Sequence, residues 1–336
     1  MKKIRLLILP LVLLFFSCEV VLDYDKGNVI IDGVTVNALA VSDTVFTATI
    51  SKSYPFYRLD AIVNSDEFFR YEGAQFNQFD DFFRDSAVVK DALVELVVND
   101  TDIYGMTYDS KTLTYNSSYI PQEGDKVVMS VQTNEFPEAR SDIKIPVSQK
   151  IEIVSYEKVY SPNYDRVVAD DFYDYLGKDT VARLTLRILD SANEENFYML
   201  KVRGGATDLQ SYETPYYYYN DIFTSSDIIF SDQQLTKGYR GWPAYFSNVF
   251  SDHFFNGQEY EFTVESRLRK FADGKNYVIV ELQSINEEFY NYLKSTMLYR
   301  ISDQDSYSEP IIIYSNVEDG WGIFGGVSTD RHVVYL

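Results

Sequence analysis

Most of the chain alternates apolar and polar residues with a period of two, which is the pattern of half-buried β-strands. The segment Thr44–Ile50 reads TVFTATI, and PQEGDKVVMSVQT is a turn followed by Val127, Met129 and Val131 at every second position. VIIDGVTV, DALVELVVND and SDIKIPVS are also strand-like, and the last contains Pro146, a residue suited to the margin of a strand. About six or seven short strands separated by turn residues predict an immunoglobulin-like β-sandwich over residues 29–148.

The second half of the chain repeats this pattern. QKIEIVSYEKV, GQEYEFTVESRL and KNYVIVELQSI alternate, and TVARLTLRILDSANEENFYMLKVRGG predicts a hairpin that turns at Ser191–Glu195. INEEFYNYLKSTMLYR differs, because Phe289, Leu293 and Met297 recur at i, i+4 and i+8, as in an amphipathic helix. The expected fold class is therefore mostly β: the N-terminal sandwich is followed by a second β-rich domain, residues 149–336, with one or two short helices.

Two stretches interrupt the regular pattern. Arg58–Ser86 is too long for a hairpin loop, and Ala206–Asp252 concentrates tyrosine, tryptophan and glycine between predicted strands. Exposed aromatic rings with polar surroundings mark binding surfaces, but tyrosine and phenylalanine also pack commonly in cores, and the sequence leaves both interpretations open. The candidate ligand- or partner-binding residues are Phe76, Phe79, Phe83, Tyr216, Tyr217, Tyr218, Tyr219, Trp242 and Tyr245.

The N-terminus has the build of a secretory signal. Three basic residues precede an apolar run, Leu6–Phe16. This run is about half of the ~20 residues that a helix needs to cross a bilayer. The run ends at Ser17, a small residue, and Cys18 follows. We therefore expect residues 1–17 to be a lipoprotein signal peptide that is removed in front of Cys18.

Cys18 is the only cysteine of the chain, so it cannot form an internal disulfide. We expect it to carry the acyl chains, palmitate among them, since stable attachment to a membrane needs at least two chains. Residues 18–28 would then form a lipid-anchored tether. The next residue is Glu19 rather than aspartate, which favours the outer membrane. The alternative is a secreted protein with a buried free thiol.

The charge of the chain excludes one class of partner. Removal of the signal leaves 27 lysine and arginine residues against 51 aspartate and glutamate residues, a net charge near −24. Such a chain repels phosphate backbones, and we expect no binding to nucleic acid. The aromatic content of 16% is too high for a disordered chain.

The sequence contains no recognisable catalytic motif. His253 and His332 are its only histidines, G-x-S-x-G does not occur, and VRGGATD lacks the lysine of a phosphate-binding loop. Zinc sites need several histidine or cysteine ligands. Glycoside hydrolysis needs only two carboxylates, but 51 acidic residues offer no way to name a pair. We expect no catalytic residue, no metal and no cofactor besides the covalent lipid on Cys18.

Two short acidic stretches deserve comparison with calcium loops. Oxygen-bearing residues stand at near-alternate positions in VNDTDIYG and SDQDSYSE. Neither segment has the full loop pattern, and tight turns prefer the same residues, so structural turns are the favoured interpretation. The residues concerned are Asn99, Asp100, Asp102, Asp303, Asp305 and Glu309.

Several of these segments occur in an order that resembles a known family. SCEVVLDYD, VIIDGVTV, TVFTATISKSYPF, DALVELVVND, FNGQEYEFTVE, VELQSINEEFYNYLKS and YSNVEDGWGIFGGVS are similar to segments of Bacteroidetes lipoproteins in the domain-of-unknown-function 4249 family. The helix around Phe289–Leu293 and a strand-turn from Asn316 to Gly325 carry most of the resemblance. The resemblance implies an outer-membrane lipoprotein that is encoded beside a TonB-dependent receptor. It implies no catalytic residues.

These observations together favour a non-enzymatic lipoprotein of the outer membrane, exposed on the extracellular face. It would capture a ligand for a TonB-dependent transporter in nutrient uptake. Two alternatives stay open: a structural or adhesive surface protein of fimbrial or matrix type, and a glycan-acting enzyme.

Overall fold

The computed structural model describes residues 33–53, 87–160, 180–192, 194–206, 223–230, 248–268, 276–302 and 311–336. These residues belong to one compact unit, Asp32–Leu336. The fold is mostly β, as the sequence predicts. The candidate residues in Arg58–Ser86 and in 206–247, and Cys18 with its signal and tether, lie outside the described residues.

The described strands form three sheets, and α6 (Glu287–Ser302) is the one α-helix of this part of the chain. Sheet A has eight strands in the order β13-β11-β15-β16-β1-β2-β6-β5. Their bounds are β13 Val249–Ser251, β11 Phe197–Ala206, β15 Asn276–Ile285, β16 Gly320–Tyr335, β1 Gly33–Val41, β2 Thr47–Ser53, β6 Thr114–Asn116 and β5 Thr107–Asp109. Sheet B consists of β4 Asp102–Gly105, β3 Leu93–Val98, β7 Lys126–Gln132 and β8 Ala139–Lys144. Sheet C consists of β12 Phe223–Thr224, β14 Glu259–Arg267, β10 Thr180–Leu189 and β9 Lys150–Tyr160.

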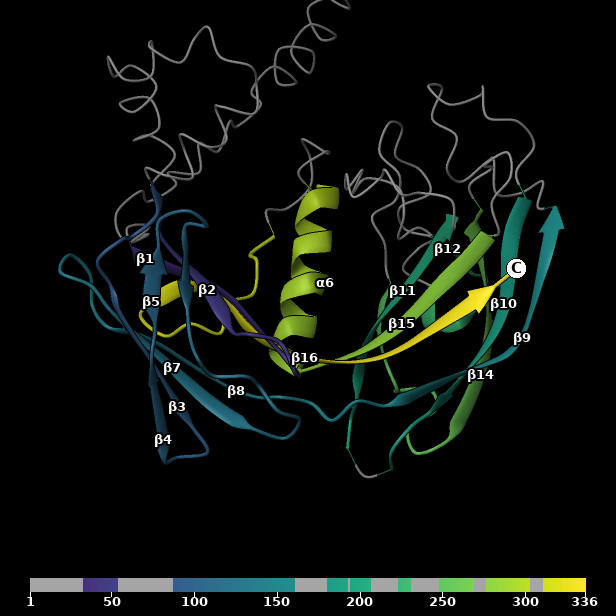
Figure 1. The fold of residues 1–336 in the computed structure, drawn as a ribbon, viewed down its shortest axis with the longest axis horizontal. Helices are drawn as coiled ribbons and strands as arrows, with labels where there is room; N and C mark the ends of the chain where they lie inside the picture. Colours follow the sequence, from purple (N-terminus) through teal and green to yellow (C-terminus); the bar gives the residue numbers. More distant parts are fainter. Residues whose placement is uncertain are drawn as a thin grey trace, which may run out of the picture. The chain divides into compact units, whose positions relative to one another are not determined.

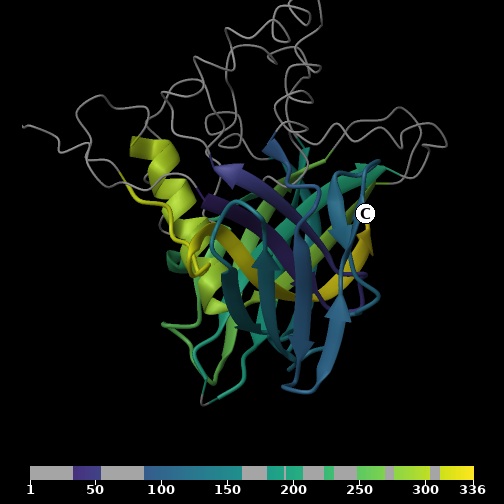
Figure 2. The same cartoon turned by 90° about the vertical axis from the view of Figure 1, so that its left-hand side faces the viewer.

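The N-terminal half is a sandwich of sheet B and the β1-β2-β6-β5 side of sheet A (Figure 2). The alternation in the sequence sets its inner face, because Val127, Met129 and Val131 are all buried in one core. Phe324 of β16 lies in the same core and packs edge-on against Phe46, with ring centroids 5.7 Å apart. The last strand of the chain therefore completes a core built mainly from its first half.

The C-terminal half packs sheet C against β11 and β15. The predicted hairpin at Ser191–Glu195 is wrong, because β10 pairs with β9 and β14 whereas β11 pairs with β13 and β15. The segment instead carries the chain from one sheet to the other. Leu184 and Leu200 are both fully buried in the shared core. Period-two alternation fixes which side chains point inward, but it does not say which strands pair.

The strand β16 belongs to both halves (Figure 1). Its first part pairs with β1 in parallel from Gly320 to Val327, and its second part pairs with β15 antiparallel from Val327 to Tyr335. The strand-turn predicted near the C-terminus is therefore one continuous strand of 16 residues. The predicted domains 29–148 and 149–336 share this strand, which makes sheet A continuous between them.

Three glycines allow β16 to pass through this crowded region. Gly322 has a φ of 104°, and a Cβ atom built on it would lie 2.0 Å from the carbonyl oxygen of Val36. A Cβ on Gly325 would lie 2.9 Å from side-chain atoms of Leu39 and of Phe289. A Cβ on Gly326 would lie 3.2 Å from atoms at the end of β8 and in the residues that follow it. At Gly322 only glycine fits the left-handed backbone conformation, and at Gly325 the lack of a side chain lets α6 approach the sheet.

Two asparagines join β16 to its surroundings. The Asn316 side chain accepts a hydrogen bond from Phe324 N at 3.0 Å and donates one to Phe324 O at 2.8 Å. Asn286, which precedes α6, accepts one from Gly326 N at 2.8 Å. These amides take the place of a neighbouring strand along this edge.

The helix α6 lies on the outer face of sheet A, the face opposite sheets B and C. Its acidic first turn suits the positive end of the helix dipole. Phe289 and Met297 are buried, and Leu293 packs against the same small core, which also contains Ile323 of β16. The structure thus confirms the helix and the apolar stripe that the sequence predicts.

Candidate functional site

Some of the polar residues that the sequence suggested as candidates for metal binding or catalysis lie in the described part of the structure. These residues have structural roles. Asn99 and Asp100 both have a positive φ in the turn between β3 and β4. Asn99 donates to Asp125 Oδ1 at 2.8 Å and accepts from Lys126 N at 3.0 Å. This confirms the turn that the sequence predicts at VNDTDIYG. Asp303, Asp305 and Glu309 lie outside the described residues.

The two histidines do not belong to a common site. His253 makes an edge-on ring contact with Phe254 in the turn after β13. His332 lies in β16, as its sequence context predicts, with Nε2 3.1 Å from Asp330 Oδ2. Burial would raise the pKa of Asp330, but hydrogen bonds from Ile151 N, Lys150 and His332 hold it below the usual value. This carboxylate fastens the start of β9 to β16.

A buried polar cluster lies where the chain crosses between sheets A and C. Asp190 accepts hydrogen bonds from the Tyr198 hydroxyl and from Gly257 N. Burial, followed by this hydrogen bond, raises the pKa of Tyr198. Asp252 is fully buried and accepts from Asn196 N at 2.9 Å, and its Oδ1 has no hydrogen-bond partner in the described part of the chain. The cluster fixes the crossover that the sequence pattern misassigns as a hairpin.

No group of three or more histidine, cysteine, aspartate or glutamate residues in the described ranges could hold a metal ion. No helix among the described residues is both long and apolar enough to cross a bilayer.

The strongest candidate site is an open groove of about 450 Å³ beside α6, on the outer face of sheet A. Its floor consists of β1 and β2, where Asn37 lies opposite Thr49 and Leu39 lies opposite Thr47. The groove volume lies within the range typical of small-molecule sites. The lining residues are Asn37, Ala38, Leu39, Val41, Thr44, Val45, Thr47, Thr49, Phe289, Tyr292 and Ile323.

None of the described side chains that line this groove is charged, although the chain as a whole carries a net charge of −21. Within the described residues, the side chains of Asn37, Thr47 and Thr49 make no hydrogen bond to the protein, and neither does the Tyr292 hydroxyl. Leu39 is 39% exposed and Val45 is 56% exposed. The groove therefore combines apolar surface with uncharged donors and acceptors that are available to a ligand.

The outward-facing residues of β1 and β2 extend this surface beyond the groove. Thr35 lies opposite Ser51 on one side and opposite Trp321 on the other. Trp321 is 42% exposed, and two atoms of its indole ring lie 3.4 Å from the Cβ position of Gly33. We call this surface the neutral face, defined as Thr35, Asn37, Leu39, Thr47, Thr49, Ser51 and Trp321.

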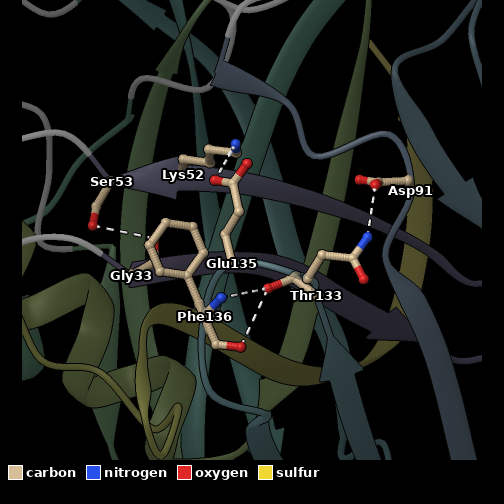
Figure 3. A network of polar contacts seen from close by, with 8 residues as sticks. Gly33, Lys52, Ser53, Asp91, Thr133, Glu135 and Phe136 are labelled. Atoms are coloured by element: carbon tan, nitrogen blue, oxygen red, sulfur yellow. Dashed lines mark hydrogen bonds and ion pairs between the residues drawn. The ribbon is translucent and has the colours of Figure 1, made fainter.

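Lys52, the one charged residue of β1 and β2, is turned away from the neutral face. Lys52 lies opposite Val34, a core residue, and its Nζ lies 2.5 Å from Glu135 Oε2 in the turn between β7 and β8 (Figure 3). Asn134 of the same turn donates to Asp91 at 3.2 Å. In the same view Ser53 donates to Gly33 O at 3.3 Å. This network fastens sheet B to β2 and holds the charge of Lys52 away from the neutral face.

The sequence alone does not single out the neutral face, although it contains the polar outward positions of both strands. The outward positions of TVNALAV and TATISKS are mostly threonine, asparagine and serine. Such residues read as ordinary solvent-facing positions until the strand order places them beside Trp321, which is separated from them by about 280 positions of sequence.

Comparison with known proteins agrees with the resemblance seen in the sequence. A search of curated proteins gives no match. The family model described as "Domain of unknown function (DUF4249)" matches residues 23–332, which is nearly the whole chain and includes every described strand except the end of β16. The protein belongs to the DUF4249 family.

Proposed function

We propose that this protein is an outer-membrane lipoprotein, anchored through Cys18 on the extracellular face, which captures a ligand for a TonB-dependent transporter. The observation that carries the binding role is the groove beside α6, where the side chains of Asn37, Thr47, Thr49 and Tyr292 have no hydrogen-bond partner among the described residues. The single cysteine behind an apolar signal supports the anchor. The family resemblance supports the transporter as partner.

A binding role suits the groove better than a catalytic one. Its lining, as far as the described residues form it, contains hydroxyl, amide and apolar groups but no carboxylate, imidazole, thiol or amine. General acid–base and nucleophilic catalysis at neutral pH depend mainly on the latter groups. A rigid sheet below and a helix beside the groove hold these groups in place, as a capture site requires.

Co-purification tests the proposed partnership. The full chain with a C-terminal tag is expressed in its native host, and outer membranes are solubilised in mild detergent. We expect a large β-barrel receptor to elute with the protein in comparable amount, and an unrelated tagged lipoprotein to elute without it. A protein that elutes alone, and whose deletion leaves nutrient uptake unchanged, would contradict the proposal.

One observation favours the structural or adhesive alternative. β9 is an edge strand of 11 residues, and among the described strands it pairs only with β10. Val154 and Tyr156 on this strand are 43% and 51% exposed. Long open edges are templates for strand addition. If β9 serves assembly, the protein will occur in polymeric surface fibres, and a proline at Val154 will remove it from them.

A further inference from the structure

We infer that the neutral face binds uncharged glycans, with the Trp321 indole as the surface on which a sugar ring stacks. This inference rests on the proposed function, because it names the ligand class of the same site. It follows from three properties of the face: an exposed aromatic ring, unpaired neutral polar groups, and the lack of charge.

The aromatic ring is in a suitable position. Trp321 is 42% exposed on a strand that is hydrogen-bonded to β1, and Gly33 has no side chain that would cover the ring. The faces of aromatic rings carry partial negative charge, and sugar C–H groups carry partial positive charge. No hydrogen bond from the indole N–H to another described residue occurs, so this group is available to a ligand hydroxyl.

The polar groups are arranged in rows next to this ring. Thr35 and Ser51 lie in the row of Trp321, Asn37 and Thr49 in the next, and Thr47 in a third. Successive rows on one face are about 7 Å apart, so the three rows span about 13 Å. Hydroxyl and amide groups can both donate and accept, and glycan hydroxyls require partners of this kind.

The lack of charge selects among possible ligands. No member of the neutral face is ionisable, and Lys52, the one ionisable residue of β1 and β2, points to the opposite side of the sheet. A sulfated or uronic-acid glycan would find no cation here, and the net charge of the chain would repel it. A free metal ion or phosphate would find no charged ligand. Uncharged sugars have no such requirement.

Fluorescence titration tests the inference. The full-length protein in detergent is prepared with Trp242→Phe, which leaves Trp321 as the single tryptophan, because the chain has two. The probes are maltohexaose, cellohexaose, xylohexaose and mannohexaose, with an oligogalacturonate of equal length as the charged comparison. We expect at least one neutral probe to shift the Trp321 emission and the charged probe to leave it unchanged.

Variants separate stacking from general folding effects, with calorimetry as the readout. We expect Trp321→Ala to weaken binding at least about tenfold, and Thr49→Val to weaken it about threefold to tenfold through the loss of one hydroxyl. Tyr335→Ala is the matched control, because Tyr335 is 62% exposed on the other half of the same strand. It should bind like the parent, and thermal melting should show all variants folded.

Each outcome of these experiments either supports or refutes the inference that the neutral face binds uncharged glycans. If no neutral hexasaccharide binds at millimolar concentration, or if binding survives Trp321→Ala, the inference is wrong. Binding of a capped Ala-Thr peptide instead of any glycan would also overturn it and indicate a protein partner. Co-purification with the receptor is measured separately. A protein that co-purifies but binds no glycan refutes only the ligand class, whereas glycan binding without a receptor refutes only the transporter partnership.

Discussion

Gly322 provides the sharpest test of the way β16 enters sheet A. Its φ of 104° disfavours any side chain, and a Cβ atom would lie 2.0 Å from the Val36 carbonyl oxygen. Backbone strain of this kind costs about 1–3 kcal/mol. The carbonyl must also move by more than an ångström, which would break one or two ladder hydrogen bonds worth about 1 kcal/mol each. We therefore expect Gly322→Ala to lower the free energy of unfolding by about 2–5 kcal/mol.

Variants of two other glycines separate the cost of backbone strain from the cost of steric overlap. Gly124 has a φ of 86° but open space around its Cβ position, so Gly124→Ala should cost only the conformational strain, about 1–2 kcal/mol. Gly105 has neither a positive φ nor a neighbour within 4 Å. Gly105→Ala, in the exposed strand β4, should change stability by less than about 1 kcal/mol and could raise it.

Scanning calorimetry of the full-length protein measures all three variants. At roughly 2 °C per kcal/mol for a unit of this size, Gly322→Ala should lower the melting temperature by about 4–10 °C, Gly124→Ala by about 2–4 °C, and Gly105→Ala by less than about 2 °C. Equal melting temperatures for the Gly322 and Gly124 variants would refute the close approach of β16 to β1. A Gly322 variant as stable as the parent would refute the bent path of β16 as well.

Three further predictions concern polar groups. Asn316→Ala removes both hydrogen bonds to Phe324 and should cost about 2–3 kcal/mol in urea unfolding, with Asn316→Asp costing less because it keeps the acceptor. Burial and then the hydrogen bond to Asp227 raise the pKa of Tyr260 to about 12, from an ordinary value of 10.0. The stability due to this shift is complete below pH 10 and is lost as the pH rises towards 12, so unfolding free energies should fall in that window and Tyr260→Phe should flatten the fall. Burial raises the pKa of Asp252, whose Oδ1 has no partner among the described residues, so Asp252→Asn should stabilise the protein by about 1 kcal/mol at pH 7, and the gain should vanish below the ordinary carboxyl pKa of 3.8. A destabilising Asp252→Asn at pH 7 would show that the carboxylate has a partner.

The local periodicity of apolar and polar residues was sufficient to predict the strands and the helix themselves. The alternation around Met129 predicts the inner face of β7, and the spacing of Phe289 and Met297 predicts the buried stripe of α6. These features depend only on residues close in sequence, since burial of one face sets the period. The mostly β class follows from them.

The pairing of strands that lie far apart in the sequence could not be predicted from local periodicity. Nothing near Gly320–Val327 indicates that it pairs with Gly33–Val41, almost the length of the chain away. The crossover at Ser191–Glu195 has the turn residues of a hairpin, and only the buried contacts of Asp190 and Asp252 show that it joins two sheets. The neutral face depends on the first of these pairings, so it could not be recognised from the sequence.

The anchor on Cys18 is the claim on which the proposed membrane role depends most directly. Mass spectrometry of the N-terminal peptide from the purified membrane fraction measures it without further assumptions. We predict a peptide that begins at Cys18 and carries a diacylglyceryl group with palmitate-length chains, and a Cys18→Ala variant that retains its signal peptide. An unmodified thiol on a protein recovered from the soluble periplasmic fraction or the medium would contradict the account.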